Sequence, residues 1–443
     1  MGKYFGTDGF RGLSNKGLKA EHAFRIGRFI GYANKDKKIK VLIARDTRLS
    51  GKMLADSLAA GIISSGGDVV NIDVSTTPSV SYLVRHCGFD FGVMISASHN
   101  PYYDNGIKIF NSLGEKLEES IENEIEKYID SVEDYIPRAL NEKLGRYLDS
   151  SKFLDLYIDF LVSKAIPQIS KLNILVDCSN GSASSIAPKL LSRLGVNASI
   201  VNSDPNGLNI NDRCGSTHIN NLSSVVKNGN YDIAFAFDGD ADRCLAMDNE
   251  GKVIDGDAIM YLNALFLKKH NQLKNNSIVL TVMSNIGLKI ALKNNNISIA
   301  EVGVGDKYVQ AEMKNKGYLL GGEQSGHIIF LDDLNTGDGL LTMIKMLNLL
   351  STEKQDIKTL LKDLTIYPQC LKNIHVSNKD AILSHQGFLN MVKECEKSLN
   401  GQGRILVRPS GTEPLIRVMA EAKTQELCEK ICDKLINYIN DLQ

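Results

Sequence analysis

Residues 40–51, KVLIARDTRLSG, have the pattern of an apolar strand that runs into a polar, glycine-containing turn and then a helix. The same layout returns at 172–181 (LNILVDCSNG) and at 277–287 (SIVLTVMSNIG). Short apolar runs that alternate with helical patterns are typical of parallel sheets with crossover helices. The sequence therefore predicts three diverged copies of one α/β unit.

Each copy continues to a second strand that ends in a polar loop. The three loops are ISASHNP at 95–101, FDGDAD at 237–242 and GGEQSGH at 321–327. Ligands of open α/β sheets bind at the carboxyl ends of the strands. We therefore expect the three loops to face one shared cleft.

The last 75 or so residues have a different pattern, with strand-like runs at 403–409 and 414–422 and a following amphipathic helix. They predict a smaller α+β domain. Another amphipathic helix is expected at about 115–134, with a solvated acidic face. The predicted fold class is α/β, with three similar mixed-sheet α/β domains plus a smaller C-terminal α+β domain around a central cleft. The expected domains are 1–148, 149–249, 250–365 and 366–443.

Charge and composition exclude several kinds of partner. Lys and Arg total 51, Asp and Glu total 52, and the formal net charge is −1, which argues against a polybasic nucleic-acid binder. The sequence lacks a run of roughly 18 apolar residues and a signal-peptide pattern. Eight scattered cysteines are typical of reduced thiols in a cytosol. We expect a cytoplasmic protein that binds neither membrane nor nucleic acid.

The loop FDGDADR at 237–243 predicts a metal site. On extended backbone, Asp238, Asp240 and Asp242 would project to one face, where the three carboxylates repel one another unless a cation lies among them. Oxygen ligands suit a hard ion, and Mg²⁺ is the expected one. An EF-hand is excluded, because its loop positions 6 and 12 hold Arg243 and Asn249.

The segment GVMISASHNPYYDNGIK at 92–108 contains the candidate nucleophile, Ser98. A serine at a strand end is exposed to a ligand and can act as a nucleophile. The GxSxG and SxxK motifs of hydrolases and penicillin-binding proteins are absent. Neighbours on extended backbone point to opposite faces, so His99 is a poor geometric candidate for the base of Ser98.

The stretch RILVRPSGTEPLIR at 404–417 predicts a phosphate site. Backbone N–H groups in a tight glycine-containing turn form an anion nest, and arginine forks match phosphate oxygens. No Walker A loop or GxGxxG turn supports a nucleotide instead. The residues of this site are Arg408, Ser410, Gly411, Thr412 and Arg417.

Three weaker signals complete the candidate site. In GGEQSGH, Glu323, Ser325 and His327 alternate and are expected to share one face that suits sugar hydroxyls. VGDKY at 304–308 adds Asp306. In FGTDGFRG, Arg11 lies among glycines, a setting for a cation near an anion.

Five motifs in order, FGTDGFRG, ISASHNPYYDNGIK, DGDADR, GGEQSGH and RPSGTEP, resemble those of the α-D-phosphohexomutase family across nearly the whole chain. The resemblance implies four domains around one cleft, in agreement with the pattern of the three α/β units. It also implies a phosphoprotein isomerase. Ala241 departs from the glycine of many relatives, but its added methyl group is not expected to prevent metal binding.

The resemblance assigns roles residue by residue. Ser98 matches the phosphorylated serine, and Asp238, Asp240 and Asp242 match the Mg²⁺ ligands, with a phosphoserine oxygen as a further ligand. Either Lys108 or His327 is expected to be the general acid or base. The residues expected near the reacting phosphate are Arg11, His99, Lys108, His327 and Arg243, and those expected to bind the rest of the substrate are Asp306, Glu323, Ser325, Arg408, Ser410, Gly411, Thr412 and Arg417.

The expected reaction interconverts glucosamine 6-phosphate and glucosamine 1-phosphate, feeding the synthesis of UDP-N-acetylglucosamine and cell-wall precursors. Glucosamine 1,6-bisphosphate, or another hexose bisphosphate, is the expected intermediate and activator. The alternatives are a relative that acts on mannose or glucose phosphates and a non-catalytic phosphosugar sensor. The expected partner is the small phosphosugar, and the protein is a monomer or a homodimer.

Overall fold

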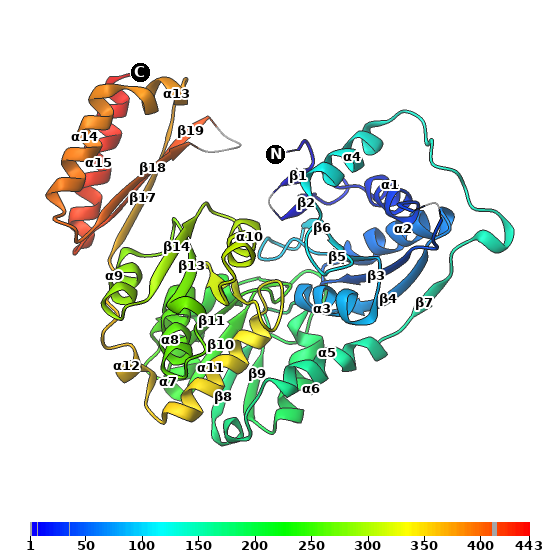
Figure 1. The fold of residues 1–443 in the computed structure, drawn as a ribbon, viewed down its shortest axis with the longest axis horizontal. Coiled ribbons are helices and arrows are strands. Elements are labelled where there is room, and N and C mark those ends of the chain that lie inside the picture. Colours follow the sequence, from blue (N-terminus) through cyan, green and yellow to red (C-terminus); the bar gives the residue numbers. More distant parts are fainter. Residues whose placement is uncertain (1, 7, 35, 410–413) are drawn as a thin grey trace. The chain divides into compact units, whose positions relative to one another are not determined.

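The computed structural model of the chain describes residues 2–6, 8–34, 36–409 and 414–443, and these residues form four sheets (Figure 1). The chain divides into two compact units. Residues 1–283 and 297–361 make up the first unit, which contains three of the sheets, and residues 284–296 and 362–443 make up the second.

The first sheet has seven strands in the order β1-β2-β6-β5-β3-β4-β7. β3 pairs in parallel with β4 and β5, whereas β6 pairs antiparallel with β5 and β2. The strands are β1 (Phe5–Gly6), β2 (Gly9–Leu13), β3 (Lys40–Arg45), β4 (Asp68–Val74), β5 (Phe91–Ile95), β6 (Asp104–Asn111) and β7 (Tyr147–Asp149). The helices of this region are α1 (Ala20–Gly31), α2 (Gly51–Ser64), α3 (Thr77–Cys87) and α4 (Glu119–Asp130), and α5 (Lys152–Ser163) follows.

The second sheet has the order β12-β11-β10-β8-β9, and the third has the order β14-β13-β15-β16. The strands of the second are β8 (Asn173–Asp177), β9 (Asn197–Val201), β10 (Ile233–Phe237), β11 (Cys244–Asp248) and β12 (Val253–Ile254). Those of the third are β13 (Ser277–Thr281), β14 (Ser298–Val302), β15 (Leu320–Gly322) and β16 (Ile328–Phe330). The helices between and after them are α6 (Ala183–Leu194), α7 (Ser223–Asn228), α8 (Gly256–Lys269), α9 (Ile286–Asn294), α10 (Asp306–Lys316), α11 (Gly339–Glu353) and α12 (Ile357–Leu360).

The three sheets contain the same four-stranded repeat. In each, a central strand (β3, β8 or β13) pairs in parallel with the next strand on one side and with the third strand on the other. A fourth strand then returns antiparallel to the third (β6 on β5, β11 on β10, β16 on β15). The predicted three similar α/β domains are confirmed. Each polar loop singled out in the sequence connects the third and fourth strands of its repeat.

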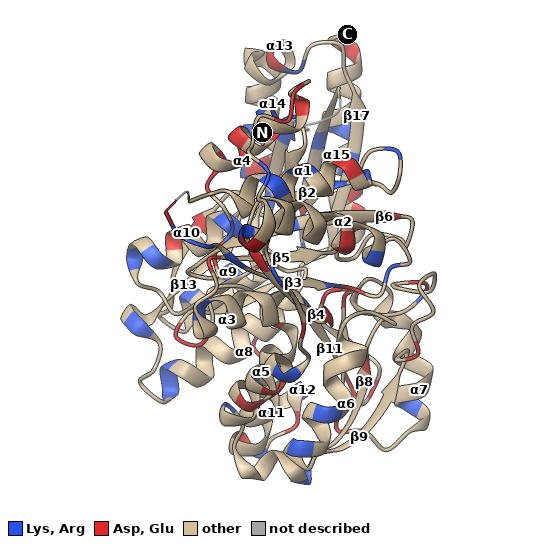
Figure 2. Cartoon of the chain, turned by 90° about the vertical axis from the view of Figure 1, so that its right-hand side faces the viewer, with Lys and Arg blue, Asp and Glu red and all other residues tan. Residues whose placement is uncertain are grey.

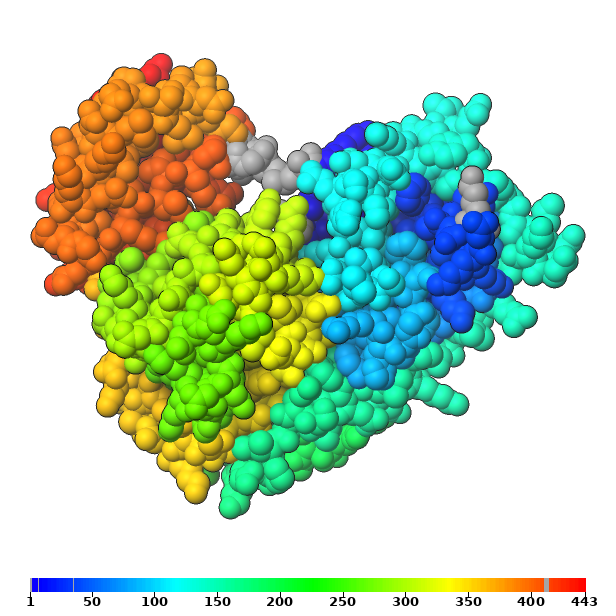
Figure 3. Space-filling model, viewed as in Figure 1, coloured from blue at the N-terminus to red at the C-terminus, as the bar shows by residue number. Residues whose placement is uncertain are grey.

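The first unit also contains direct contacts between its repeats. Thr77 Oγ1 donates a hydrogen bond of 2.5 Å to Asp240 Oδ2, and Asn335 Nδ2 donates one of 2.9 Å to the carbonyl oxygen of Leu113. In the space-filling view, residues near 335 (yellow) abut residues near 110 (cyan) (Figure 3). The strand-end loops of the three repeats are therefore held within one unit.

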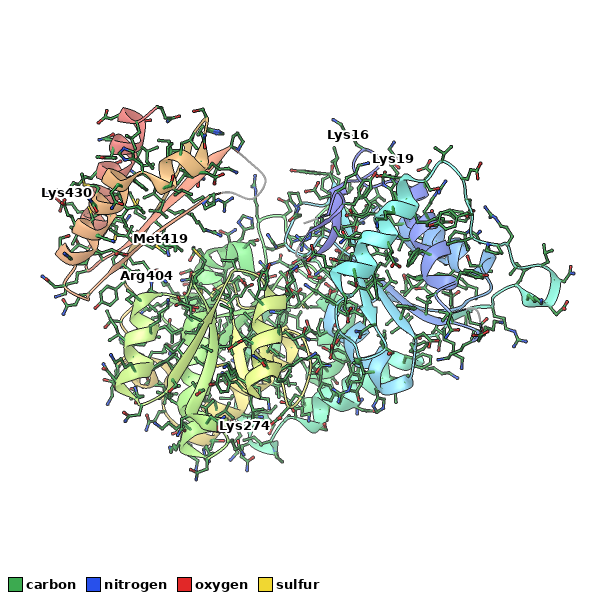
Figure 4. All side chains as sticks on the ribbon, turned by 45° about the horizontal axis from the view of Figure 1, so that its top comes forward. Lys16, Lys19, Lys274, Arg404, Met419 and Lys430 are labelled. Atoms are coloured by element: carbon green, nitrogen blue, oxygen red, sulfur yellow. The ribbon has the colours of Figure 1, made fainter. Side chains whose placement is uncertain are left out.

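The second unit contains the predicted smaller α+β domain. Its antiparallel sheet has the order β17-β19-β18, formed by β17 (Gln369–His375), β19 (Leu415–Glu421) and β18 (Arg404–Pro409). Three helices accompany it: α13 (Lys379–Ser384), α14 (Gln386–Ser398) and α15 (Gln425–Asp441). Figure 4 marks Arg404 and Met419 on this sheet and Lys430 on α15. Arg404 Nε donates to buried Glu421 at 2.6 Å, and Ile431, Leu435 and Ile439 of α15 are buried as their spacing predicts.

The helix expected at about 115–134 is shorter, because α4 ends at Asp130 and Val132 beyond it is almost fully exposed. Its acidic face is not simply solvated. Glu126 is buried and accepts hydrogen bonds from the backbone N–H groups of Lys3, Tyr4 and Phe5 at 2.7–2.8 Å. This carboxylate therefore holds the N-terminal strand β1, a long-range role that helical periodicity cannot reveal.

Acidic and basic residues alternate along the ribbon in Figure 2, without a long run of one sign. This distribution agrees with the near-zero formal charge. None of the helices built from the described residues is both long enough and apolar enough to cross a membrane.

We predict that Gly61→Val destabilises the protein by about 1–3 kcal/mol, because overpacking a tight contact forces a backbone shift. Gly61 lies where α2 crosses α1, and a Cβ atom there would overlap the carbonyl oxygen of Phe24. Thermal unfolding measures the effect. Ala60→Val is the matched control, because Ala60 is the exposed neighbour on the same helix. Equal unfolding temperatures for the two variants would contradict the prediction.

Candidate active site

The three aspartates of the loop between β10 and β11 converge on one point. Asp238, Asp240 and Asp242 are all buried, and one carboxylate oxygen from each lies within 4.8 Å of the others. The expectation of extended backbone is wrong, because the loop is a tight turn. The Ala241 N–H donates to the carbonyl oxygen of Asp238 at 3.1 Å, and Ala241 adopts a φ of 55°. The turn, rather than strand alternation, brings the carboxylates together.

Lys108 of β6 supplies the nearest counter-charge. Its Nζ lies 2.7 Å from Asp240 Oδ2, 3.2 Å from Asp242 Oδ2 and 3.0 Å from Asp8 Oδ2, and the side chain is buried. Although burial lowers the pKa of Lys108, the surrounding carboxylates raise it well above its usual value. Lys108 therefore stays protonated and offsets part of the charge of the triplet.

Asp238 is the carboxylate that Lys108 leaves least compensated. Burial, together with the charges of Asp242 and Asp240, raises the pKa of Asp238 well above its usual value. Within the described parts of the chain, Asp240 Oδ1 and Asp242 Oδ1 are buried without a hydrogen-bond partner. Three close carboxylates with two unpartnered oxygens fit a hard divalent cation.

Ser98 lies beside this triplet, on the loop between β5 and β6. Its Oγ donates to Asp238 Oδ2 at 2.5 Å, and its φ is 52°, in the left-handed region. Ser98 is fully buried, with its hydroxyl turned toward Asp238. One expectation is wrong. Since the backbone is not extended, His99 is not on the opposite face, and its Nδ1 lies 3.4 Å from Ser98 Oγ.

His99 is held in its neutral form. Burial and the positive charges of Arg243 and Arg11 lower its pKa to about 4. Since the Ser98 hydroxyl donates to Asp238, the neutral imidazole can donate from Nδ1–H to Ser98 Oγ at 3.4 Å.

A chain of alternating charges connects the triplet to the third repeat. Asp8 forms ion pairs with Arg11, with Lys108 and with Lys116, whose Nζ lies 2.5 Å from Asp8 Oδ1. Lys116 Nζ also lies 2.5 Å from Asp306 Oδ2, and Asp306 Oδ2 lies 3.6 Å from His327 Nε2. Although burial raises the pKa of Asp8, Lys108 and Lys116 lower it well below its usual range. The side chains in this series of ion pairs, as far as Asp306, are therefore charged.

A cavity of about 400 Å³ opens beside these groups and is lined by residues of all three repeats. The volume is in the range of small-ligand sites. Arg11, His99 and Arg243 place positive or donor groups at its wall, and Glu323 and His327 face it from the third repeat. The full lining is Tyr4, Gly6, Asp8, Gly9, Arg11, His99, Asp242, Arg243, Val304, Gly305, Asp306, Glu323 and His327. The expectation that the three polar loops share one cleft is met within the first unit.

The GGEQSGH loop contributes unequally. Glu323 and His327 line the cavity, and Glu323 Oε1 accepts a hydrogen bond from the N–H of Gly305 at 3.2 Å. Ser325 does not line it, because residues 323–327 form a turn in which the Gly326 N–H donates to the carbonyl oxygen of Glu323. The expected alternation of Glu323, Ser325 and His327 on one face is therefore wrong. Ser325 Oγ is buried and lacks a hydrogen-bond partner among the described residues.

The arginines of the second unit form an unusual pair. Arg408 of β18 lies directly opposite Arg417 of β19 in the antiparallel register. Burial and the charge of Arg417 lower the pKa of Arg408. Like charges directly opposite on a sheet are destabilising, and an anion held by both guanidinium groups would offset the repulsion. Ser410, Gly411 and Thr412, also expected here, lie outside the described residues.

Sequence reasoning missed several residues of the first unit. Asp8 and Lys116 connect the charges, and Thr77 donates to Asp240. Asp8 lies inside the FGTDGFRG motif, so its acidic side chain three residues before Arg11 was a usable signal. Lys116 gives no such signal, because its partners lie 108 and 190 residues away in the sequence.

Comparison with known proteins agrees with this architecture. Four family models match the chain: phosphoglucomutase/phosphomannomutase alpha/beta/alpha domain I at residues 2–136, domain II at 155–251, domain III at 255–367 and the C-terminal domain at 371–437. The fold is thus that of a phosphohexomutase with three α/β domains and a smaller fourth. The chain belongs to the phosphoglucomutase/phosphomannomutase family and is a mutase of the isomerase class. The exact domain borders at 148, 249 and 365 stay a prediction.

Relatives in sequence carry a more specific name. Phosphoglucosamine mutase of Lachnoclostridium phytofermentans is 48% identical over 437 residues, which cover 98% of each chain. Phosphoglucosamine mutase of Bacillus velezensis is 47% identical over 441 residues, 99% of this chain and 98% of the relative.

Solved structures share the fold. A phosphoglucomutase/phosphomannomutase family protein from Burkholderia thailandensis superposes with a TM-score of 0.81 at 24% identity, covering 99% of this chain and 98% of the other. N-acetylphosphoglucosamine mutase of Aspergillus fumigatus, solved in complex with GlcNAc-6P and magnesium, has a TM-score of 0.71 at 19% identity and covers 99% of this chain and 95% of its own.

We predict that Asp238→Asn raises the unfolding temperature at pH 8 without divalent ions and abolishes the stabilisation by Mg²⁺. The pKa of Asp238 is higher in the folded state than its unfolded value of about 3.9, so its ionised form costs stability that grows as pH rises through the folded pKa. An amide removes that cost and one ligand. Thermal unfolding in chelator and in Mg²⁺ measures both effects.

Asp248→Asn is the matched control. Asp248 ends β11 in the same sheet and accepts backbone N–H groups of Glu250 and Lys252, away from the triplet. This control should keep the full response to Mg²⁺. The prediction fails if Asp238→Asn is less stable than wild type in chelator at pH 8 and still gains stability from Mg²⁺.

Proposed function

We propose that the protein interconverts glucosamine 6-phosphate and glucosamine 1-phosphate through a phosphorylated Ser98. The observation that carries the proposal is the 2.5 Å hydrogen bond from Ser98 Oγ to Asp238, which places a nucleophilic oxygen directly at the acidic triplet. The specificity for glucosamine is supported by the relatives named phosphoglucosamine mutase at 47–48% identity.

The acidic triplet suits a phosphoserine only with a cation. A phosphoryl group on Ser98 would bring a charge near −2 against the Asp238 carboxylate. Asp238, Asp240 and Asp242, with an oxygen of phosphorylated Ser98, would hold Mg²⁺ and neutralise that charge. Bound Mg²⁺ supplies charge stabilisation to the phosphoryl group.

The cavity side chains bind and orient the substrate. Arg11 and Arg243 offer guanidinium donors for the reacting phosphate, and Glu323 accepts from sugar hydroxyls. Arg408 and Arg417, with Ser410, Gly411 and Thr412, are proposed to bind the phosphate that is not reacting. The phosphoryl group on Ser98 passes to the free hydroxyl, giving a 1,6-bisphosphate, and the other phosphate then returns to Ser98.

Between the two candidates for general acid and base, the contacts favour His327. Lys108 is held by three carboxylates that keep it protonated, so it cannot take up a proton near neutral pH. His327 faces the cavity, and neither ring nitrogen has a hydrogen-bond partner among the described residues. His327 is therefore proposed to exchange the proton with the sugar hydroxyl, while Lys108 balances the charge.

The reaction would supply the 1-phosphate used to make UDP-N-acetylglucosamine and cell-wall precursors in the cytoplasm. A mutase that prefers mannose or glucose phosphates is the second candidate, because the family model covers both activities. Initial rates on the 6-phosphates of glucosamine, mannose and glucose, each with a bisphosphate activator, separate the two. The proposal requires glucosamine 6-phosphate to have the highest kcat/KM.

We predict that Ser98→Ala abolishes turnover and also loses the phosphate adduct seen by intact mass after incubation with glucose 1,6-bisphosphate. Removal of Oγ removes the phosphoryl acceptor. Ser14→Ala is the control, because its hydroxyl contacts Ser50 Oγ on a neighbouring loop and not the triplet. An adduct retained by Ser98→Ala would place the carrier elsewhere. Binding of the sugar phosphate without turnover by wild type would support a phosphosugar sensor instead.

We predict that His327→Gln lowers kcat by about 10²–10⁴-fold, the usual contribution of a general acid or base. The variant should still accept phosphate on Ser98 from glucose 1,6-bisphosphate at measurable yield. An unchanged kcat would return Lys108 as the candidate.

A further inference from the structure

We propose that Arg48 and Asn211 are positioning residues that clamp the Ser98 loop from two different domains, and that this clamp sets the rate at which Ser98 accepts a phosphoryl group. The proposal rests on the proposed function, in which Ser98 carries the phosphate. Neither residue lines the cavity, and the side-chain hydrogen bonds of both go to other groups than the three carboxylates. Their target is the backbone carbonyl of Ser98 itself.

Arg48 follows β3 of the first domain and is buried. All five N–H groups of its guanidinium have acceptors. Nε donates to Asp46 Oδ2 at 2.8 Å, and the terminal nitrogens donate to the carbonyl oxygens of Ser98, Asn100, Pro101 and Asp104. Four of the five bonds go to one loop. A buried arginine thus organises the backbone between β5 and β6 rather than binding a ligand.

Asn211 belongs to the second domain and reaches the same loop. Its Nδ2 donates to the Ser98 carbonyl oxygen at 2.9 Å and to the Asn100 carbonyl oxygen at 3.1 Å, the two carbonyls that Arg48 also contacts at 2.8 Å. Asn211 is itself buried and fixed by its backbone N–H, which donates to the carbonyl oxygen of Ser179 at 2.9 Å. The second domain therefore holds the Ser98 loop through hydrogen bonds of Asn211 that are separate from the contacts of the acidic triplet.

Gly239 closes the remaining side of the Ser98 carbonyl. A Cβ atom at Gly239 would lie 2.5 Å from the Ser98 carbonyl oxygen and 2.9 Å from Asn211 Nδ2. The Ser98 carbonyl thus accepts hydrogen bonds from Arg48 and Asn211 on one side and packs against the Gly239 backbone on the other. This packing leaves the carbonyl no room to rotate. Holding this carbonyl restrains the ψ angle of Ser98, next to its left-handed φ of 52°, a conformation that costs an L-residue energy and persists where its surroundings impose it.

The side chain of Ser98 is aimed by the same arrangement. Its N–H donates to Ser96 Oγ at 2.9 Å, and Ser96 Oγ donates to Asp46 Oδ2 at 2.7 Å, the carboxylate oxygen that Arg48 contacts. Both ends of the Ser98 residue are therefore held through Asp46 and Arg48. Because the N–H and carbonyl groups of Ser98 are both held, its Oγ points at Asp238. Under the proposed function, the phosphoryl group is transferred to Oγ at this position.

The chemical step that depends on this aim is the transfer from a hexose bisphosphate to Ser98. The P–O bond to the sugar breaks, a P–Oγ bond forms, and the proton lost from the serine hydroxyl balances the one gained by the sugar oxygen. A displacement of the nucleophile by about 1 Å can cost on the order of 10²-fold in such a step. A clamp on the backbone therefore acts on the transfer rate and not on sugar binding.

The test uses full-length Asn211→Ala, with Asn209→Ala as the matched control. Asn209 lies on the same loop, and its Nδ2 also donates to a backbone carbonyl, that of Asp204 at 3.0 Å, but it does not touch the Ser98 loop. Dephosphorylated protein is mixed with saturating glucose 1,6-bisphosphate and Mg²⁺. Quenched samples are analysed by intact mass and by phosphopeptide mapping of Ser98.

We expect Asn211→Ala to phosphorylate Ser98 roughly 10- to 100-fold more slowly than Asn209→Ala, with KM for the sugar phosphate unchanged. Arg48→Lys keeps the charge beside Asp46 but loses the fork that reaches four carbonyls, and it should slow the same step. If the alanine variant does not fold, Asn211→Asp replaces it in the test. This substitution keeps the size of the side chain but puts an acceptor oxygen where Nδ2 donates.

Transfer in folded Asn211→Ala and Arg48→Lys at the rate of Asn209→Ala would overturn the inference. A rise in KM with an unchanged transfer rate would also overturn it, since it would assign these residues to substrate binding. Failure of the proposed function is separate, because it shows as wild-type protein that gains no phosphate on Ser98 at all.

Discussion

The burial of three carboxylates around one point is the constraint on which the site depends. Asp238, Asp240 and Asp242 repel one another, and the protein offsets this with Lys108 and Thr77, both from the first domain. The second domain can keep its acidic loop only while the first domain stays against it. The same charge pairs therefore place the three carboxylates and hold the first two domains together. The ion pairs of Asp8 with Lys116 and of Lys116 with Asp306 connect the third domain in the same way.

The three repeats show how one scaffold gives different chemistry at equivalent places. The connection between the third and fourth strands carries a serine in the first domain, three aspartates in the second and Glu323 with His327 in the third. The strand frame places these loops at a common cavity, and each loop is free to differ because its backbone is not part of the sheet. Function thus resides in grafted loops, while the sheets provide the placement.

Much of this arrangement could be predicted from the sequence. Strand–turn–helix spacing indicated the three units and the equivalence of their loops, and the DGDADR and ISASHNP motifs indicated the triplet and Ser98. The side-chain directions could not be predicted, because Ser98 and Ala241 adopt left-handed φ values that alternation along a strand does not reveal. The contacts of Glu126, Lys116 and Asn211 depend on tertiary packing across long sequence separations, which local patterns do not encode.

The left-handed backbone at Ser98 has a consequence for engineered mimics of the phosphorylated enzyme. Aspartate tolerates this region better than most residues, so the main chain would accept an acidic replacement readily. Its carboxylate, however, is shorter than a phosphate ester, carries less charge and would meet Asp238 head-on. An aspartate at this position would thus keep the backbone of the loop but add a fourth negative charge to the three carboxylates. Such a variant would measure how much negative charge the site accepts, and it would not mimic the enzyme phosphorylated on Ser98.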